Sequence, residues 1–152
     1  MSTTTPPTAD LHVVVGYDGS PPANRALDAA VGLLRGRTGR IELVYVAHLS
    51  STAMLSAGAV AEIEAGFDQI EQELRTAAEE RLRDRQEAWG FQRRQGMIVD
   101  HLIAVANDIR DAHPGDIVVI VVGSSSEAMH RAVGSVAVSL ARHAPVPLVI
   151  VP

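Results

Sequence analysis

Two separate segments of the chain carry residues suited to holding a phosphorylated small molecule. The first is Asp18-Gly19-Ser20, which follows an apolar run. The second is Gly123-Ser124-Ser125-Ser126, followed by Gly134-Ser135-Val136 at the expected start of a helix. Backbone N–H groups at a helix N-terminus point outward with the positive end of the helix dipole, so such a loop can bind phosphate oxygens. The two segments predict a phosphate site if the fold brings them together.

A purely structural interpretation of both segments is also open. Asp18-Gly19-Ser20 has the composition of a turn followed by a helix N-cap, with Pro21 at the first helical position. The segment from Gly123 to Ser126 can likewise be a turn that leaves a buried strand.

Several kinds of chemistry are excluded by missing residue types. Cysteine is absent, which rules out disulfides, thiolate nucleophiles and Cys-ligated metals. All thirteen basic residues are arginine, so no lysine Schiff base and no P-loop lysine exist. The serines lack the G-x-S-x-G pattern, and the histidines lack H-x-x-x-H or H-x-x-E-H spacing. We therefore expect no catalytic residue, and no metal beyond Mg²⁺ that accompanies a nucleotide.

The composition indicates one globular domain. The chain has 152 residues, of which 47% are hydrophobic and 20% charged. A net charge of -5 argues against nucleic acid or anionic lipid as the main partner, and 3% aromatic residues argue against stacking on single strands. Apolar runs such as Ile117 to Val122 are too short to span a bilayer. These features predict a cytoplasmic protein, with a disordered tail at residues 1–9 and a domain at residues 10–152.

Strand and helix patterns alternate along the chain. Apolar, β-branched runs predict strands at Leu11–Gly16, Ile41–Val46, Phe91–Ile98, Asp116–Val122 and Leu148–Val151. Helical spacing predicts four helices: from Pro21 to about Leu34, from Val60 to Trp89-Gly90, from about Asp100 to just before Pro114, and from Gly134 to His143. In the longest helix the expected buried positions include Leu74, Ala77 and Arg81. The state of residues 47–57 is left undecided by the pattern.

This alternation predicts an α/β fold, a doubly wound parallel sheet of five strands with helices on both faces. The Gln- and Arg-rich strand after Phe91 suits an edge of the sheet, and Asp116–Val122 suits its centre. Ligands of such sheets bind beyond the carboxyl ends of the strands, where the winding reverses. If the first strand and Asp116–Val122 flank that point, Asp18 and Gly123 face each other.

Three segments resemble the universal stress protein family. Val13-Val14-Val15-Gly16-Tyr17-Asp18-Gly19-Ser20 is similar to its opening V-x-x-D-G-S, while Val121-Val122-Gly123-Ser124, Gly134-Ser135-Val136 and Arg142 to Val151 are similar to its closing segment. The resemblance implies a five-stranded parallel sheet, related to the adenine nucleotide alpha hydrolase fold. It also implies a homodimer through the last strand and, in part of the family, ATP binding.

The resemblance assigns roles to residues of this chain. Asp18 would contact ribose, the backbone of Val46 would meet adenine, and Gly123, Ser124, Ser126, Gly134, Ser135 and Val136 would belong to the phosphate loop. The family's loop reads G-x-x-G, nine residues, then G-[ST], whereas here Ser126 replaces the second glycine and seven residues precede Gly134. Glu127 adds an anion there and Arg131 a cation. A Cβ at Ser126 hinders close approach of a phosphate, so ATP binding should be weak or absent.

The sequence supports two hypotheses about function. The first is a non-catalytic stress-response and regulatory module that binds ATP or a related adenine nucleotide weakly. The alternative is a flavodoxin-like small-molecule enzyme, a hydrolase or phosphoryl-transfer protein that uses the same crevice.

Overall fold

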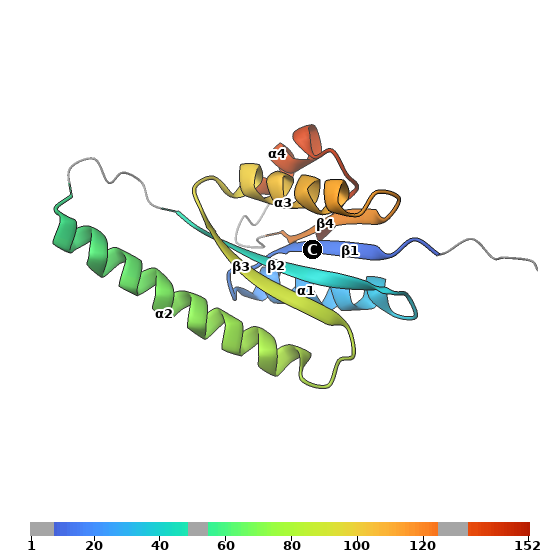
Figure 1. Ribbon diagram of the computed structural model, residues 1–152, viewed down its shortest axis with the longest axis horizontal. Helices are drawn as coiled ribbons and strands as arrows, with labels where there is room; N and C mark the ends of the chain where they lie inside the picture. The colour runs from blue at the N-terminus through green and yellow to red at the C-terminus, as the bar shows by residue number, and fades with distance from the viewer. Residues whose placement is uncertain (1–7, 49–54, 125–133) are drawn as a thin grey trace, which may run out of the picture.

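The protein is a parallel sheet between two layers of helices (Figure 1). The computed structural model describes residues 8–48, 55–124 and 134–152. Its strands are β1 (Leu11–Gly16), β2 (Gly39–Ala47), β3 (Ala88–Gln95), β4 (Ile117–Gly123) and β5 (Leu148–Val151). They form one sheet in the order β3-β2-β1-β4-β5, with every neighbouring pair parallel. This confirms the predicted five-stranded doubly wound sheet, with β3 at an edge. The strand β4, predicted at the centre, is an inner strand, and β1 takes the middle place.

Each face of the sheet is covered by two helices. On one face lie α1 (Pro21–Leu34) and α2 (Ala57–Leu82), and on the other lie α3 (Ile98–Ala112) and α4 (Ser135–His143) (Figure 1). Along β1, Val13 and Val15 pack toward α1, whereas Val14 packs toward α3. Because both faces are buried, β1 and β4 have continuous β-branched sequences rather than alternating ones. None of the described helices is long and apolar enough to cross a membrane.

The boundary between α2 and β3 differs from the prediction. The helix was expected to reach Trp89-Gly90, but α2 ends at Leu82, and β3 begins at Ala88 rather than at Phe91. The physical reason is pairing across the sheet, because Trp89 lies opposite Ile41 and Gly90 opposite Glu42 in β2. A long-range strand ladder therefore overrides local helical spacing at these positions.

The undecided stretch at residues 47–57 is defined only at its ends. Ala47 is the last residue of β2, and Ser56 caps α2 by accepting a 3.2 Å hydrogen bond from the Ala59 N–H. Residues 49–54 lie outside the described part of the chain, as do residues 1–7 of the predicted tail.

The buried face of α2 is rotated from the predicted one. Leu74, Ala78 and Leu82 are buried, whereas Ala77 and Arg81 are exposed. Steps of four residues keep these buried side chains in line, and the Arg81 guanidinium instead pairs with Asp28 of α1 at 2.6 and 3.0 Å. The N-terminal part of α2 extends beyond the strands of the sheet (Figure 1). Ile70, near the middle of this helix, is 40% exposed.

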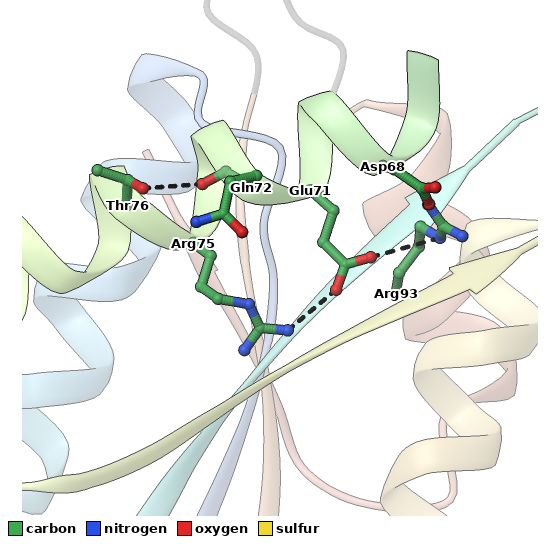
Figure 2. Close-up of polar contacts among 6 residues, drawn as sticks. All are labelled: Asp68, Glu71, Gln72, Arg75, Thr76 and Arg93. Carbon is green, nitrogen blue, oxygen red and sulfur yellow. Dashed lines mark hydrogen bonds and ion pairs between the residues drawn. The ribbon is translucent and has the colours of Figure 1, made fainter. Parts of the chain in front are cut away.

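Ion pairs connect α2 to the edge strand β3 (Figure 2). The Arg93 guanidinium of β3 donates a 2.7 Å hydrogen bond to Asp68 and lies 3.6 Å from Glu71 and from Glu64. Glu71 also accepts a 2.9 Å hydrogen bond from Arg75, whose guanidinium lies over the ring of Phe91 at 4.9 Å. The acidic side chains of α2 and the arginines of α2 and β3 therefore pair with one another.

Candidate functional site

A cavity of about 320 Å³ opens at the carboxyl ends of the strands. The strand β1 pairs with β2 on one side and with β4 on the other, so the winding of the sheet reverses beside β1. Six of the eight predicted site residues line the cavity: Asp18, Val46, Gly123, Gly134, Ser135 and Val136. The fold therefore brings together segments that lie more than 100 residues apart in the sequence.

Asp18 occupies the turn between β1 and α1. Gly19 makes this turn with a φ of 75°, a conformation that favours glycine. The Asp18 Oδ1 atom accepts a 3.0 Å hydrogen bond from the Ser20 N–H, and the Ser20 hydroxyl accepts one of 3.3 Å from the Ala23 N–H. The turn and N-cap of the structural interpretation are thus confirmed, and the exposed Asp18 lines the cavity as well.

The walls of the cavity are mainly apolar. Val46, Ile98, Val122 and Val136 line it from four different elements. Burial raises the pKa of the lining residues Tyr17 and Tyr45 above its usual value, so both phenols stay protonated at neutral pH.

The N-terminus of α4 faces this cavity, and no described side chain caps it. Its N-cap residue is Gly134, which makes no side-chain hydrogen bond, and the first turn of α4 contains no acidic residue. Gly134, Ser135, Val136 and Ala137 all line the cavity. The first N–H groups of a helix have no partner within the helix, so this end offers donors and a positive dipole to an anion.

Gly123 has a packing role that the sequence did not reveal. A Cβ atom on Gly123 would lie 2.1 Å from the carbonyl oxygen of Pro22, far inside van der Waals contact. The glycine therefore allows the end of β4 to approach the start of α1. This contact explains the glycine without a phosphate, so a side chain at this position would disturb packing as well as ligand binding.

Ser124, a further predicted residue, does not line the cavity. The Ser124 N–H donates a 2.8 Å hydrogen bond to the Val151 carbonyl, so this donor extends the sheet and is not free for a phosphate. Ser126 lies outside the described residues, together with Glu127 and Arg131.

A cluster of possible metal ligands lies at the amino ends of β1 and β4, opposite the cavity, where the sequence predicted none. His12 Nε2 lies 2.9 Å from Asp116 Oδ2, and His113 Nδ1 lies 3.9 Å from the same oxygen. The hydrogen bond from His12 lowers the pKa of Asp116, and the Asp10 N–H acts in the same direction, so the carboxylate is charged at neutral pH. Sequence spacing does not reveal this cluster, because His12 lies in β1 and the other two residues lie in the connection between α3 and β4. Only the His113-x-x-Asp116 spacing was visible.

Comparisons with known proteins agree with the fold. No curated protein sequence matched the chain. A universal stress protein, UspA, from Lactobacillus plantarum is similar in structure, with a TM-score of 0.72, 19% identity, and 95% and 99% of the two chains covered. A universal stress protein in complex with cAMP gives a TM-score of 0.66 at 22% identity, covering 95% of this chain and 99% of that one.

A universal stress protein family protein from Arabidopsis thaliana with AMP bound gives a TM-score of 0.57 at 15% identity, with 95% and 91% covered. At these identities the likeness to solved structures concerns the fold. Membership rests on the sequence, because the model of the universal stress protein family matches residues 11–152, nearly the whole chain. Because this match covers nearly the whole chain, the chain belongs to the universal stress protein family.

Proposed function

We propose that this protein is a non-catalytic stress-response module that binds ATP or a related adenine nucleotide weakly at the carboxyl ends of β1 and β4. One observation carries the proposal. The Asp18 carboxylate, apolar walls and the N-terminus of α4 all open onto the same cavity. Its volume of about 320 Å³ lies within the range of small-molecule sites.

The lining residues match the chemical parts of a nucleotide. One oxygen of Asp18 is held by the Ser20 N–H, and the second oxygen makes no hydrogen bond with the described part of the chain, so it can accept one from a ribose hydroxyl. The apolar side chains around Val46 suit the adenine base, which would contact the Val46 backbone. The N–H groups at the start of α4 suit phosphate oxygens, together with any Mg²⁺ that a nucleotide brings.

The solved structures with cAMP and with AMP bound support an adenine nucleotide as the ligand class. The departures of this chain from the family's loop support weak binding, since Ser126 replaces a glycine and the loop is two residues shorter. Nothing in the comparisons supports the flavodoxin-like enzyme.

The inventory of catalytic groups supports binding without turnover. Hydrolysis of a phosphoanhydride needs a positioned base and cations that stabilise the transferring group. Within the described lining residues, Asp18 is the one carboxylate, and no arginine or histidine lines the cavity. Asp18 is assigned to the ribose, so no base is proposed beside the phosphates.

Replacing Asp18 with asparagine tests the proposed site. The amide oxygen can still accept the Ser20 N–H, so the turn should persist, while the charged acceptor for ribose is lost. A hydrogen bond to a charged group contributes about 1.5–3 kcal/mol, so we expect the affinity for AMP, cAMP or ATP to fall at least about tenfold. Isothermal titration calorimetry measures the affinity of each nucleotide.

The matched control is Asp84→Asn, at an exposed residue outside the cavity, which should bind like the unchanged protein. Equal losses in both variants, or no binding by the unchanged protein at millimolar nucleotide, would refute the proposed site. Phosphate release from ATP that co-purifies with the protein and disappears in Asp18→Asn would instead establish the enzyme alternative.

We also propose a homodimer through β5. This strand lies at an edge of the sheet, and its four residues are half-buried. The carbonyls of Pro147 and Val151 accept hydrogen bonds from the Ile120 N–H of β4 and from the Ser124 N–H just after it. The backbone groups of Leu148 and Ile150 therefore point away from the sheet. An antiparallel pair with the same strand of a second copy would satisfy these groups in both chains.

The expected mass in light scattering is therefore that of two chains. Ile150→Pro removes an outward N–H and should shift the mass toward one chain at micromolar concentration, because proline cannot donate. Ile150→Ala is the control, since it loses similar side-chain packing but keeps the donor. A monomeric unchanged protein, or equal behaviour of the two variants, would contradict pairing through β5. The disordered tail at residues 1–9, the domain at residues 10–152 and a cytoplasmic location remain predictions.

A further inference from the structure

We propose that His12, His113 and Asp116 bind a divalent transition-metal ion of the zinc class. His12 lies in β1, His113 is the C-cap residue of α3, and Asp116 directly precedes β4. They lie at the amino ends of the strands, about 13 Å along β1 from Gly16 of the nucleotide cavity. The site is thus separate from the proposed nucleotide site.

The distances suit one ion between three ligand atoms. His12 Nε2, His113 Nδ1 and a carboxylate oxygen of Asp116 all lie within 4.8 Å of one another. Zinc binds histidine nitrogen and carboxylate oxygen at about 2.0–2.2 Å, so two ligands of a tetrahedral ion lie about 3.3 Å apart. The two separations from Asp116 Oδ2, 2.9 and 3.9 Å, lie on either side of this value. The nitrogens of His12 and His113 lie within 4.8 Å of each other, so the exposed His113 side chain must move inward to close the set.

Contacts outside the cluster hold two of the ligands in place. The Asp116 Oδ1 atom accepts a 3.2 Å hydrogen bond from the Asp10 N–H, which leaves Oδ2 directed at the histidines. The His12 side chain is only 11% exposed and is fixed by its place in the central strand. Such outer contacts orient ligands and raise the affinity of metal sites.

The donor set selects the kind of ion. Two imidazole nitrogens and one carboxylate oxygen suit zinc and neighbouring transition metals, whereas Mg²⁺ and Ca²⁺ prefer oxygen ligands alone. The Asp10 carboxylate is engaged by the Thr38 hydroxyl, so the described protein supplies three ligands. The His113 side chain is 53% exposed, so the ion is reached from solvent and a water molecule can complete a tetrahedral shell.

A simple pair between His12 and Asp116 explains only part of the cluster. That pair satisfies a nearly buried imidazole without any metal. The His12–Asp116 pair can form without His113. The His113 ring nevertheless stacks on that of His12 with centroids 4.7 Å apart, and its Nδ1 lies near the same carboxylate oxygen. The third ligand therefore distinguishes a metal site from an ion pair, and the test rests on it.

Titration of the untagged, chelator-treated full chain with Co²⁺ tests the proposal. We expect one Co²⁺ per chain, with the visible absorption of a tetrahedral ion, and displacement by one equivalent of Zn²⁺ but not by Mg²⁺. His113→Ala should weaken binding at least about tenfold, because loss of a direct ligand costs no less than loss of an outer contact. Since His113 is exposed and outside the core, this variant keeps the His12–Asp116 pair and should remain folded.

His143→Ala is the matched control, because His143 is also an exposed histidine that ends a helix, where its Nδ1 lies 2.8 Å from the Ser139 carbonyl. It should bind Co²⁺ like the unchanged protein. Asp116→Asn should lose binding as His113→Ala does, and if it fails to fold, His113→Ala decides alone. Absence of a one-to-one complex, or binding that His113→Ala leaves unchanged, would overturn the proposal.

Discussion

The Gly123→Ala substitution is expected to lower the free energy of unfolding by about 3 kcal/mol, although it adds a single methyl group. The new Cβ would lie 2.1 Å from the Pro22 carbonyl oxygen and 2.4 Å from its carbon. These are backbone atoms in the first turn of α1, so relief requires a shift of the whole helix start rather than a change of rotamer. Thermal unfolding should show a fall in midpoint of about 6–12 °C for a chain of this size.

The matched control is Gly66→Ala. Gly66 lies in the middle of the exposed part of α2, and a Cβ there meets no atom within 4 Å. Because glycine weakens a helix, this substitution should raise the stability by about 0.5–1 kcal/mol. Similar small effects of the two substitutions would mean that β4 and α1 are not in close contact, and the glycine at 123 would then need another explanation, such as a ligand.

The Leu102→Ala substitution should have an effect of comparable size on the other face of the sheet. Leu102 of α3 is fully buried in the core cluster that includes Val14, Val44 and Ile120. Removing its side chain leaves a cavity that a rigid sheet cannot fill, and such substitutions cost about 2–5 kcal/mol. Urea unfolding monitored by circular dichroism measures the change in free energy.

Leu33→Ala provides the comparison, since this leucine of α1 is 38% exposed. Its loss should change the stability by about 0.5 kcal/mol or less. If both leucine substitutions cost the same, α3 does not form the tight second layer described here, and the covering of both faces of the sheet would have to be reconsidered.

Local signals were sufficient for the strands at the centre of the fold. The boundaries of β1 and β5 agree with those predicted, and β4 is displaced by one residue. These strands are short runs of β-branched residues bounded by glycine or proline, so propensity and burial favour the same structure. The position of Asp18 beside Gly123 followed from the rule for parallel sheets alone.

The structural features that the sequence did not predict depend on contacts between distant parts of the chain. The end of α2 at Leu82 depends on pairing of Trp89 with Ile41, and its buried face depends on where the helix meets α1 and β3. The space at Gly123 is limited by Pro22, which lies about 100 residues earlier in the chain. The cluster of His12 and Asp116 joins residues separated by 104 positions, so no spacing rule applies to it.

The position of β1 has a consequence for how the chain folds. As the first strand made, β1 can pair with β2 early, but its other partner, β4, becomes complete only at Gly123. Closing so long a loop makes the central pairing a late step with a high contact order, and folding should be slower than in helical domains of this length. During synthesis the open side of β1 is an unpaired apolar edge that other chains can join. Aggregation of ribosome-bound chains should therefore fall once β4 has left the exit tunnel.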